Sequence, residues 1–262
     1  MVKYIYTFSS VKNLPNDLIR SVKSLIRYVP PEDIIVYYTP PVDESHMEEL
    51  DSLEVEIRTV DHISDSFSMT GSDKPSHYGD KLWLCEVEEE TVVFLDCDTI
   101  VLEDPEKLIE GKFDFKARPG SYNLNRDKWK SLFEKTDSEF MRWMPNTGFM
   151  IFKDGVHREI SQEWRDYLTN RDLYRDLAEV KHLEQYALAL AVSDYENTQM
   201  SKNDHVFEWE DEVNSAGVVY HIGKRGIKDP RVLILEYVDG FIPFLDLEHL
   251  VRSGYSKLKT YM

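Results

Sequence analysis

The sequence predicts an α/β fold whose central sheet is mostly parallel and is covered by helices on both faces. Strand-like segments rich in β-branched and aromatic residues alternate with amphipathic segments, which is the pattern of parallel strands joined by crossover helices. The apolar run 92–95, bounded by charged residues, is typical of a strand buried on both faces. The 262 residues contain no Pro/Gly/Ser-rich linker, so one large domain is expected.

The first third of the chain predicts a βαβ unit followed by a third strand. A helix with Leu18, Val22 and Leu25 on one face ends at the prolines of positions 30 and 31. Residues 61–77 are polar and irregular, and predict a mobile loop. The other elements expected in this part are strands 2–7, 33–38 and 55–60 and helix 47–53.

The remainder of the chain continues the alternation. A helix carrying Ile160, Trp164 and Leu168 follows a strand, and residues 181–192 form a clear amphipathic helix. Residues 230–262 show no clear helical or strand periodicity of hydrophobic residues. The other elements expected here are helix 79–87 and strands 91–95, 113–118, 148–152 and 218–221.

Composition excludes some classes of function. The formal charge of −18 and the pI of about 4.8 disfavour nucleic acid as a partner, since nucleic acid needs a basic surface. A diphosphate would also be repelled unless a metal ion and local cations offset the charge. The apolar runs are too short to cross a bilayer, no signal peptide is evident, and Cys85 and Cys97 are expected to be reduced, buried thiols. A cytoplasmic protein, with at most peripheral membrane contact, is therefore expected.

The most informative segment is the pair of carboxylates after the apolar run. Asp96 and Asp98 follow a predicted central strand, and open α/β sheets bind ligands at the carboxyl ends of their strands. If the backbone stays extended, both side chains point the same way and Cys97 points back into the core. Adjacent carboxylates repel each other, and a divalent cation relieves that repulsion. The alternative interpretation is a pair of aspartates that cap a turn.

The same residues permit a phosphatase. Asp96-Cys97-Asp98-Thr99 also fits the first motif of haloacid-dehalogenase-like phosphatases, in which Asp96 would be the nucleophile and Asp98 the general acid/base. That motif normally follows the first strand of its domain, whereas here several predicted elements precede it. No later acidic pair after a strand offers a magnesium site.

Four motifs in order carry a resemblance to a known family. They are Tyr78-Gly79-Asp80-Lys81-Leu82, Asp96-Cys97-Asp98, Asn146-Thr147-Gly148 and Val219-Tyr220-His221-Ile222-Gly223-Lys224. The chain resembles GT-A-fold glycosyltransferases, most closely glycosyltransferase family 8, which includes glycogenin-like enzymes and bacterial lipopolysaccharide galactosyl- and glucosyltransferases. Residues 182–188 are similar to the start of the family's Asp-Gln helix near the sugar, with Glu184 in place of Asp.

The resemblance implies a set of roles. Asp96, Asp98 and His221 would hold Mn²⁺ or Mg²⁺, with the imidazole favouring manganese. Glu184, Gln185 and Asn146 would be the catalytic residues that lie near the reacting sugar. The spacing after His221 departs from the family, so both Lys224 and Lys228 are candidates for the lysine that binds the diphosphate. Donor-binding residues would be Thr7, Lys81, Asp96, Asp98, Asn146, Thr147, Gly148, Gly223, Lys224 and Lys228.

The implied activity is transfer of a hexose from a nucleotide-diphosphate sugar, in particular a UDP-sugar, to an acceptor hydroxyl with retention of configuration. Residues 1–230 would form the GT-A nucleotide-sugar-binding and catalytic domain, and residues 231–262 an extension packed on it. The acceptor, whether glycan, lipid-linked or protein, is not indicated. A phosphatase and an inactive nucleotide-sugar-binding relative remain as alternatives.

Overall fold

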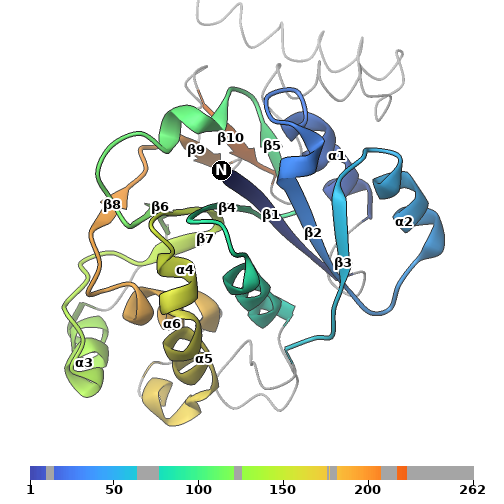
Figure 1. The fold of residues 1–262 in the computed structure, drawn as a ribbon. Helices are drawn as coiled ribbons and strands as arrows, with labels where there is room; N and C mark the ends of the chain where they lie inside the picture. Colours follow the sequence, from blue (N-terminus) through green and yellow to red (C-terminus); the bar gives the residue numbers. More distant parts are fainter. Residues whose placement is uncertain are drawn as a thin grey trace, which may run out of the picture.

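The computed structural model describes residues 1–9, 15–63, 77–120, 126–175, 177, 182–207 and 217–222. The predicted α/β fold is confirmed: a seven-stranded sheet forms the centre of the molecule and helices cover both of its faces (Figure 1). Residues 223–262, which include the predicted C-terminal extension, lie outside the described residues.

The central sheet is mostly parallel, as predicted. β7 runs antiparallel to its neighbours β4 and β6, and every other neighbouring pair is parallel. β1 and β4 therefore lie side by side at the middle of the sheet, with their carboxyl ends at the same edge. The strands in spatial order are β3 (Glu56–Thr59), β2 (Ile34–Thr39), β1 (Val2–Ser9), β4 (Thr91–Leu95), β7 (Pro145–Phe152), β6 (Phe115–Pro119) and β8 (Asn197–Gln199).

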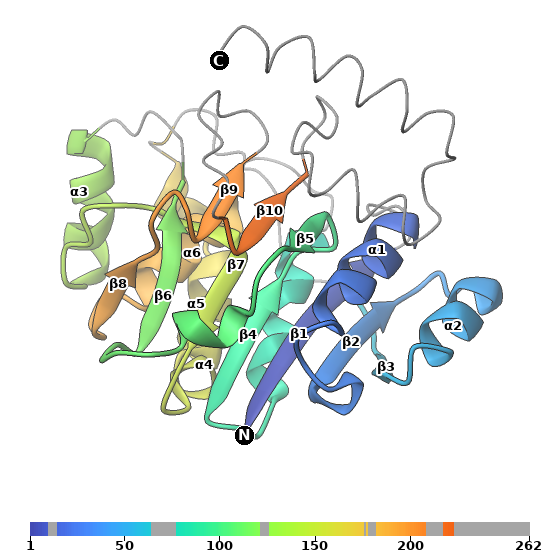
Figure 2. The same cartoon turned by 90° about the horizontal axis from the view of Figure 1, so that it is seen from above.

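A second sheet of three short strands lies beside the large one (Figure 2). β5 (Thr99–Val101) leaves the turn that follows β4, and it pairs antiparallel with β10 (Val219–His221), which pairs parallel with β9 (His205–Phe207). In this register His221 lies opposite Thr99. The small sheet therefore carries the C-terminal end of the described chain back to the edge where β4 ends.

Helices pack in two layers. α1 and α2 lie on one face of the sheet, while α4, α5 and α6 lie on the other (Figure 1). The α-helices are α1 (Pro15–Leu25), α2 (Glu44–Asp51), α3 (Arg126–Thr136), α4 (Val156–Glu159), α5 (Ser161–Thr169) and α6 (Leu183–Ala191). The 3-10 helices are η1 (Pro31–Asp33), η2 (His77–Glu86), η3 (Pro105–Leu108) and η4 (Arg171–Tyr174).

Each central strand contributes to two hydrophobic cores because its side chains alternate between the faces of the sheet. Tyr4 and Tyr6 of β1 join the core on the side of α1, whereas Ile5 joins the core on the side of α5 and α6. In β4, Val93 and Leu95 face the first core and Phe94 the second. All of these side chains are almost completely buried. The interpretation of residues 92–95 as a strand covered on both faces is thus confirmed.

Some local predictions were wrong. The α-helix predicted at residues 79–87 is the 3-10 helix η2, whose residues 79–82 are all buried. β8 and β9, of three residues each, were not predicted, because segments this short show no periodicity. No helix in the described ranges combines the length and apolar character needed to span a bilayer. Cys85 and Cys97 are free and buried, as expected.

Candidate metal centre

The two aspartates lie in a tight turn between β4 and β5. The Thr99 hydroxyl donates to the carbonyl of Asp96 at 2.7 Å, and the Asp96 amide donates to the carbonyl of Gly148 at 2.8 Å. The thiol of Cys97 donates to the carbonyl of Thr7 at 3.3 Å and is buried in the core. The inward direction of Cys97 is therefore confirmed, but the extended backbone predicted for these residues is wrong: a turn brings the carboxylates together.

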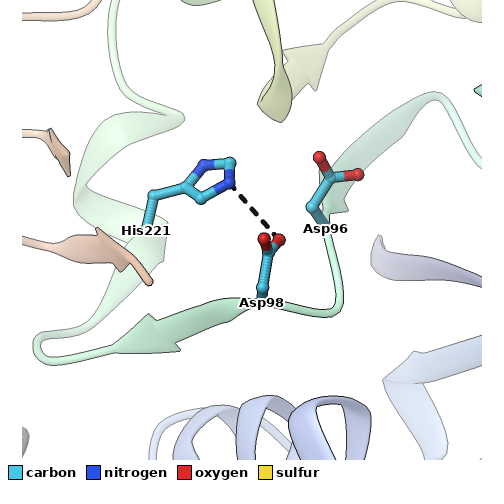
Figure 3. Close-up of side chains that lie close together, drawn as sticks. All are labelled: Asp96, Asp98 and His221. Atoms are coloured by element: carbon cyan, nitrogen blue, oxygen red, sulfur yellow. Dashed lines mark ion pairs between the residues drawn. The ribbon is translucent and has the colours of Figure 1, made fainter. Parts of the chain in front are cut away.

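His221 completes a three-residue cluster with these aspartates. Pairing of β10 with β5, and a hydrogen bond from the Ile222 amide to the carbonyl of Asp98 at 2.7 Å, hold the end of β10 beside the turn. Nε2 of His221 lies 3.3 Å from Oδ1 of Asp98, and the three side chains point toward one common space (Figure 3). One ligand atom from each of Asp96, Asp98 and His221 lies within 4.8 Å of the others. Two carboxylates and one imidazole suit a divalent ion such as Mn²⁺.

Gly148 makes room for this imidazole. A Cβ atom at position 148 would lie 2.5 Å from Cε1 and 2.8 Å from Nδ1 of His221. Sequence reasoning placed Asn146, Thr147 and Gly148 at the start of a strand, and the structure places them inside β7, where the glycine faces His221. A neighbouring side chain of the same protein therefore requires the glycine at this position.

The charges around His221 act in opposite directions. Burial alone would lower the pKa of His221, but the neighbouring carboxylates of Asp98 and Asp96 raise it above its ordinary value. On the other side, Nδ1 of His221 lies 3.3 Å from Nε2 of His205. Burial, His221 and Arg118 together hold the pKa of His205 well below its ordinary value. Sequence reasoning missed His205, since a single histidine in a three-residue strand gives no signal.

Lys81 supplies a buried cation to the cluster. Its Nζ lies 2.7 Å from Oδ1 of Asp96, and it donates to the carbonyl and hydroxyl of Thr147 at 2.9 and 3.1 Å. The side chain is only 3% exposed, so Lys81 is not a solvated surface lysine. Lys81 thus links η2, β4 and β7 and offsets the charge of one aspartate.

Glu184 and Gln185 begin α6 and are both buried, which excludes an exposed helix pair. Glu184 is 1% exposed, and within the described ranges neither carboxylate oxygen has a hydrogen-bond partner; Nδ1 of His182 lies 3.7 Å from Oε1. The side-chain oxygen of Gln185 is likewise buried without a partner there. Unsatisfied buried polar atoms are costly, and a bound polar ligand is one way to satisfy them.

Tyr78 connects these two groups of residues. Its ring packs edge-on against His182, with centroids 5.8 Å apart. Burial raises the pKa of the Tyr78 hydroxyl, and the charges of Glu184, Asp96 and Asp98 raise it further. The carboxylates of α6 and of the turn after β4 therefore act on the same hydroxyl.

The other predicted residues are placed as follows. Asn146 is buried, and its side-chain oxygen accepts from the Gly148 amide at 2.9 Å. Thr7 lies on β1, where its carbonyl accepts the Cys97 thiol. Gly223, Lys224 and Lys228 lie outside the described residues.

No protein-family model matches this chain, and no curated protein matches it. Solved structures do. An active-site variant of LgtC, with glutamate replacing glutamine, superposes with a TM-score of 0.64 at 13% identity over 93% of this chain and 98% of that chain. The galactosyltransferase LgtC with donor and acceptor sugar analogues gives a TM-score of 0.62 at 14% identity over 93% and 98% of the two chains.

A third similar structure is the bifunctional glycosyltransferase WbbM, with a TM-score of 0.60 at 12% identity. The alignment covers 89% of this chain and 49% of WbbM, so this chain spans about half the length of WbbM. These three similarities each extend over most of this chain. This chain therefore has the GT-A fold found in glycosyltransferases.

Proposed function

We propose that this protein is a metal-dependent glycosyltransferase that moves a hexose from a nucleotide-diphosphate sugar, in particular a UDP-sugar, to an acceptor hydroxyl. The observation that carries the proposal is the convergence of Asp96, Asp98 and His221 at the carboxyl end of β4 in a GT-A fold. This is the edge at which open α/β sheets bind ligands. The similarity to LgtC, solved with donor and acceptor sugar analogues, supports a sugar nucleotide and a sugar acceptor.

Asp96, Asp98 and His221 would hold Mn²⁺, or Mg²⁺ with lower preference because imidazole is a poorer ligand for magnesium. When bound, such an ion supplies Lewis acidity to the departing diphosphate. Lys81 keeps the carboxylate of Asp96 in place through their 2.7 Å contact. It also offsets negative charge in a chain that carries −18 overall. Gly223 and either Lys224 or Lys228 remain proposed donor-binding residues.

Binding of the sugar would use the polar atoms that the fold leaves unsatisfied. The carboxylate of Glu184 and the side-chain oxygen of Gln185 are acceptors, and together they suit the O–H groups of neighbouring sugar hydroxyls. Asn146, Thr147 and Thr7 complete the proposed donor site. In a retaining transfer, the acceptor hydroxyl attacks from the face that the diphosphate leaves, and a diphosphate oxygen takes the proton. Much of the rate acceleration would then come from positioning.

The decisive test is the Asp98→Asn variant. Calorimetry of UDP binding with and without Mn²⁺ should show metal-dependent affinity in the parent protein and none in Asp98→Asn. Asp51→Asn, at an exposed position of α2, should bind as the parent does. Circular dichroism should show that both variants remain folded. Unchanged Mn²⁺-dependent UDP affinity in Asp98→Asn would refute the site.

A second measurement separates the alternative functions. A glycosyltransferase should slowly hydrolyse one member of a panel of UDP-sugars in the absence of acceptor, and an inactive relative should bind the donor without hydrolysing it. A haloacid-dehalogenase-like phosphatase should instead hydrolyse a generic phosphate ester. The phosphatase is disfavoured because Asp96 follows the fourth strand in the chain and already pairs with Lys81.

A further inference from the structure

We infer that His205 is a positioning residue for the proposed metal ligand His221: it holds the imidazole proton on Nδ1, so that the lone pair of Nε2 faces Asp96 and Asp98. The inference rests on the proposed metal site and adds a residue to which no role has been assigned. It is carried by the contact between the two rings and by the surroundings of His205.

The small sheet fixes the two histidines against each other. β9 and β10 pair in parallel, with His205 opposite Val219 and Phe207 opposite His221, so the histidines are diagonal neighbours on one face. Their rings are nearly parallel, at 19° and 5.5 Å between centroids. Nε2 of His205 lies 3.3 Å from Nδ1 of His221. The backbone of Gly148 lies close to Cε1 and Nδ1 of the same ring, so the imidazole has little room to turn toward β7.

A metal ligand needs one defined tautomer. Nε2 is the nitrogen that faces Asp98, so it must carry the lone pair when the ion is bound. The proton of a neutral His221 must then be on Nδ1, where the facing atom is Nε2 of His205. The Nδ1–H of His221 therefore donates to Nε2 of His205. Partners of this kind orient ligating histidines and raise their basicity in metal sites.

His205 is itself held in a neutral, apolar environment. It is 0% exposed, and the rings of Phe149 and Phe207 lie 5.6 and 4.7 Å from its own. Arg118 donates to the backbone carbonyl of His205 at 2.5 Å, while its guanidinium lies over Phe207. On these elements the ring faces aromatic side chains, and the side chain that it contacts through Nε2 is His221.

The position of the ring proton of His205 shows that His205 is not there for packing. With Nε2 accepting from His221, the proton of His205 is on Nδ1, which is buried and has no partner in the described part of the chain. A buried donor without a partner costs about 1–3 kcal/mol. An apolar side chain among Phe149 and Phe207 would avoid this cost, so the acceptor at Nε2 is the function that justifies a histidine here.

The test uses two substitutions of nearly equal length. His205→Gln can place an acceptor where Nε2 lies, whereas His205→Met cannot. Free Mn²⁺, measured by electron paramagnetic resonance during titration of the protein with Mn²⁺ alone, should give parent-like affinity for His205→Gln, within about threefold. His205→Met should bind about 10–100-fold more weakly, the usual effect of removing such a partner. Denaturant unfolding in EDTA should show that His205→Met is at least as stable as the parent.

A double-mutant cycle separates positioning from a general effect on the fold. If His205 acts through His221, then His205→Met should leave Mn²⁺ affinity unchanged in a His221→Ala background. Calcium, which prefers oxygen ligands, should lose less affinity than Mn²⁺ in His205→Met. The side-chain oxygen of asparagine in His205→Asn does not reach the Nε2 position, so this variant should bind Mn²⁺ more weakly. If the methionine variant does not fold, His205→Asn replaces it in the comparison with His205→Gln.

The outcomes distinguish this inference from the proposed function. Equal Mn²⁺ affinity in the glutamine, methionine and asparagine variants, or an undiminished effect of His205→Met without His221, would overturn the role of His205. In either case loss of Mn²⁺ binding in Asp98→Asn would leave the metal site standing. Absence of Mn²⁺ binding in the parent protein would refute both.

Discussion

The imidazole of His221 occupies the space that a side chain at Gly148 would need, since a Cβ there would lie 2.5 Å from Cε1 of the ring. Gly148 lies on β7 of the large sheet and His221 on β10 of the small sheet. The contact is therefore where the two sheets meet beside the aspartates. Alanine at position 148 must displace the ring, because the backbone of β7 is held on both sides by β4 and β6.

Gly148→Ala should lower Mn²⁺ affinity at least about tenfold, because a shift of the ring on the order of an ångström removes it from ligand geometry. Gly111→Ala is the matched control. Its φ of +97° strains an alanine, but nothing lies within 4 Å of the added Cβ. The control should lose about 1–2 kcal/mol of stability and keep its Mn²⁺ affinity. Comparable Mn²⁺ affinities in the two variants would contradict the proposed packing role.

Lys81 and Asp96 should be energetically coupled. Lys81→Met leaves a partly buried carboxylate without its cation, and should lower the free energy of unfolding by roughly 2–3 kcal/mol. Lys81→Met with Asp96→Asn removes both charges and should recover part of that loss. The coupling energy, measured by urea unfolding in EDTA, should be about 0.5–3 kcal/mol. Strict additivity of the two substitutions would show that the 2.7 Å contact contributes nothing.

The contribution of two buried histidines, His157 and His46, to stability should fall as the pH drops below about 6.5, the ordinary pKa of histidine. Burial lowers the pKa of His157, whose Nε2–H donates to the carbonyl of Val87 at 2.9 Å, and burial also lowers the pKa of His46. The unfolded chain therefore binds protons that the native state does not, so this contribution is complete above 6.5 and is lost as the pH falls through the lowered values.

The variant that tests this pH dependence is His157→Gln, which keeps a donor near the carbonyl of Val87 and does not titrate. Between pH 7 and pH 5, its unfolding free energy should depend less steeply on pH, by up to ~1.4 kcal/mol per pH unit for one proton. Urea titrations at each pH provide the measurement. Parallel curves for variant and parent would exclude His157 as a source of the slope.

The turn that carries the aspartates should depend on a buried group of hydroxyls behind it. Ser21 Oγ of α1 lies 3.0 Å from both Tyr6 Oη and Thr99 Oγ1, and Thr99 donates to the carbonyl of Asp96. Ser21→Ala should cost about 1–2 kcal/mol of stability, because the buried hydroxyls of Tyr6 and Thr99 each lose a hydrogen bond.

Thr99→Val should cost a similar amount, and the double variant less than the sum, because the two hydroxyls share one contact. Ser52→Ala, at an exposed helix end, should change stability by less than about 0.5 kcal/mol. Denaturant unfolding of the four variants checks the prediction. If the double variant loses as much stability as the two single variants together, Ser21 and Thr99 act independently.

Long periodic segments and the strongest motif were predictable from the sequence. β4 was predicted with the bounds that the structure has, because the charged residues on both sides of the apolar run mark where the buried strand begins and ends. The Asp96, Asp98 and His221 cluster was predicted only through the family resemblance, because nothing local in the sequence brings β10 to the end of β4.

Tertiary contacts decided what the sequence did not predict. The turn at Asp96 depends on hydrogen bonds from Thr99 and to Gly148, which extended spacing does not anticipate. Lys81 was expected at the donor, and its contact with Asp96 depends on how η2 packs on β4 and β7. The contact of His205 with His221 depends on the pairing of β9 with β10, which the sequence did not predict.

The pairing of β10 with β5 also determines when the protein can become competent during its synthesis. A nascent chain that has emerged only as far as β4 and β5 presents the two aspartates without an imidazole, and the third ligand arrives with the last strand that the structure describes. Incomplete translation products that stop before β10 would therefore lack one of the three residues of the proposed metal site.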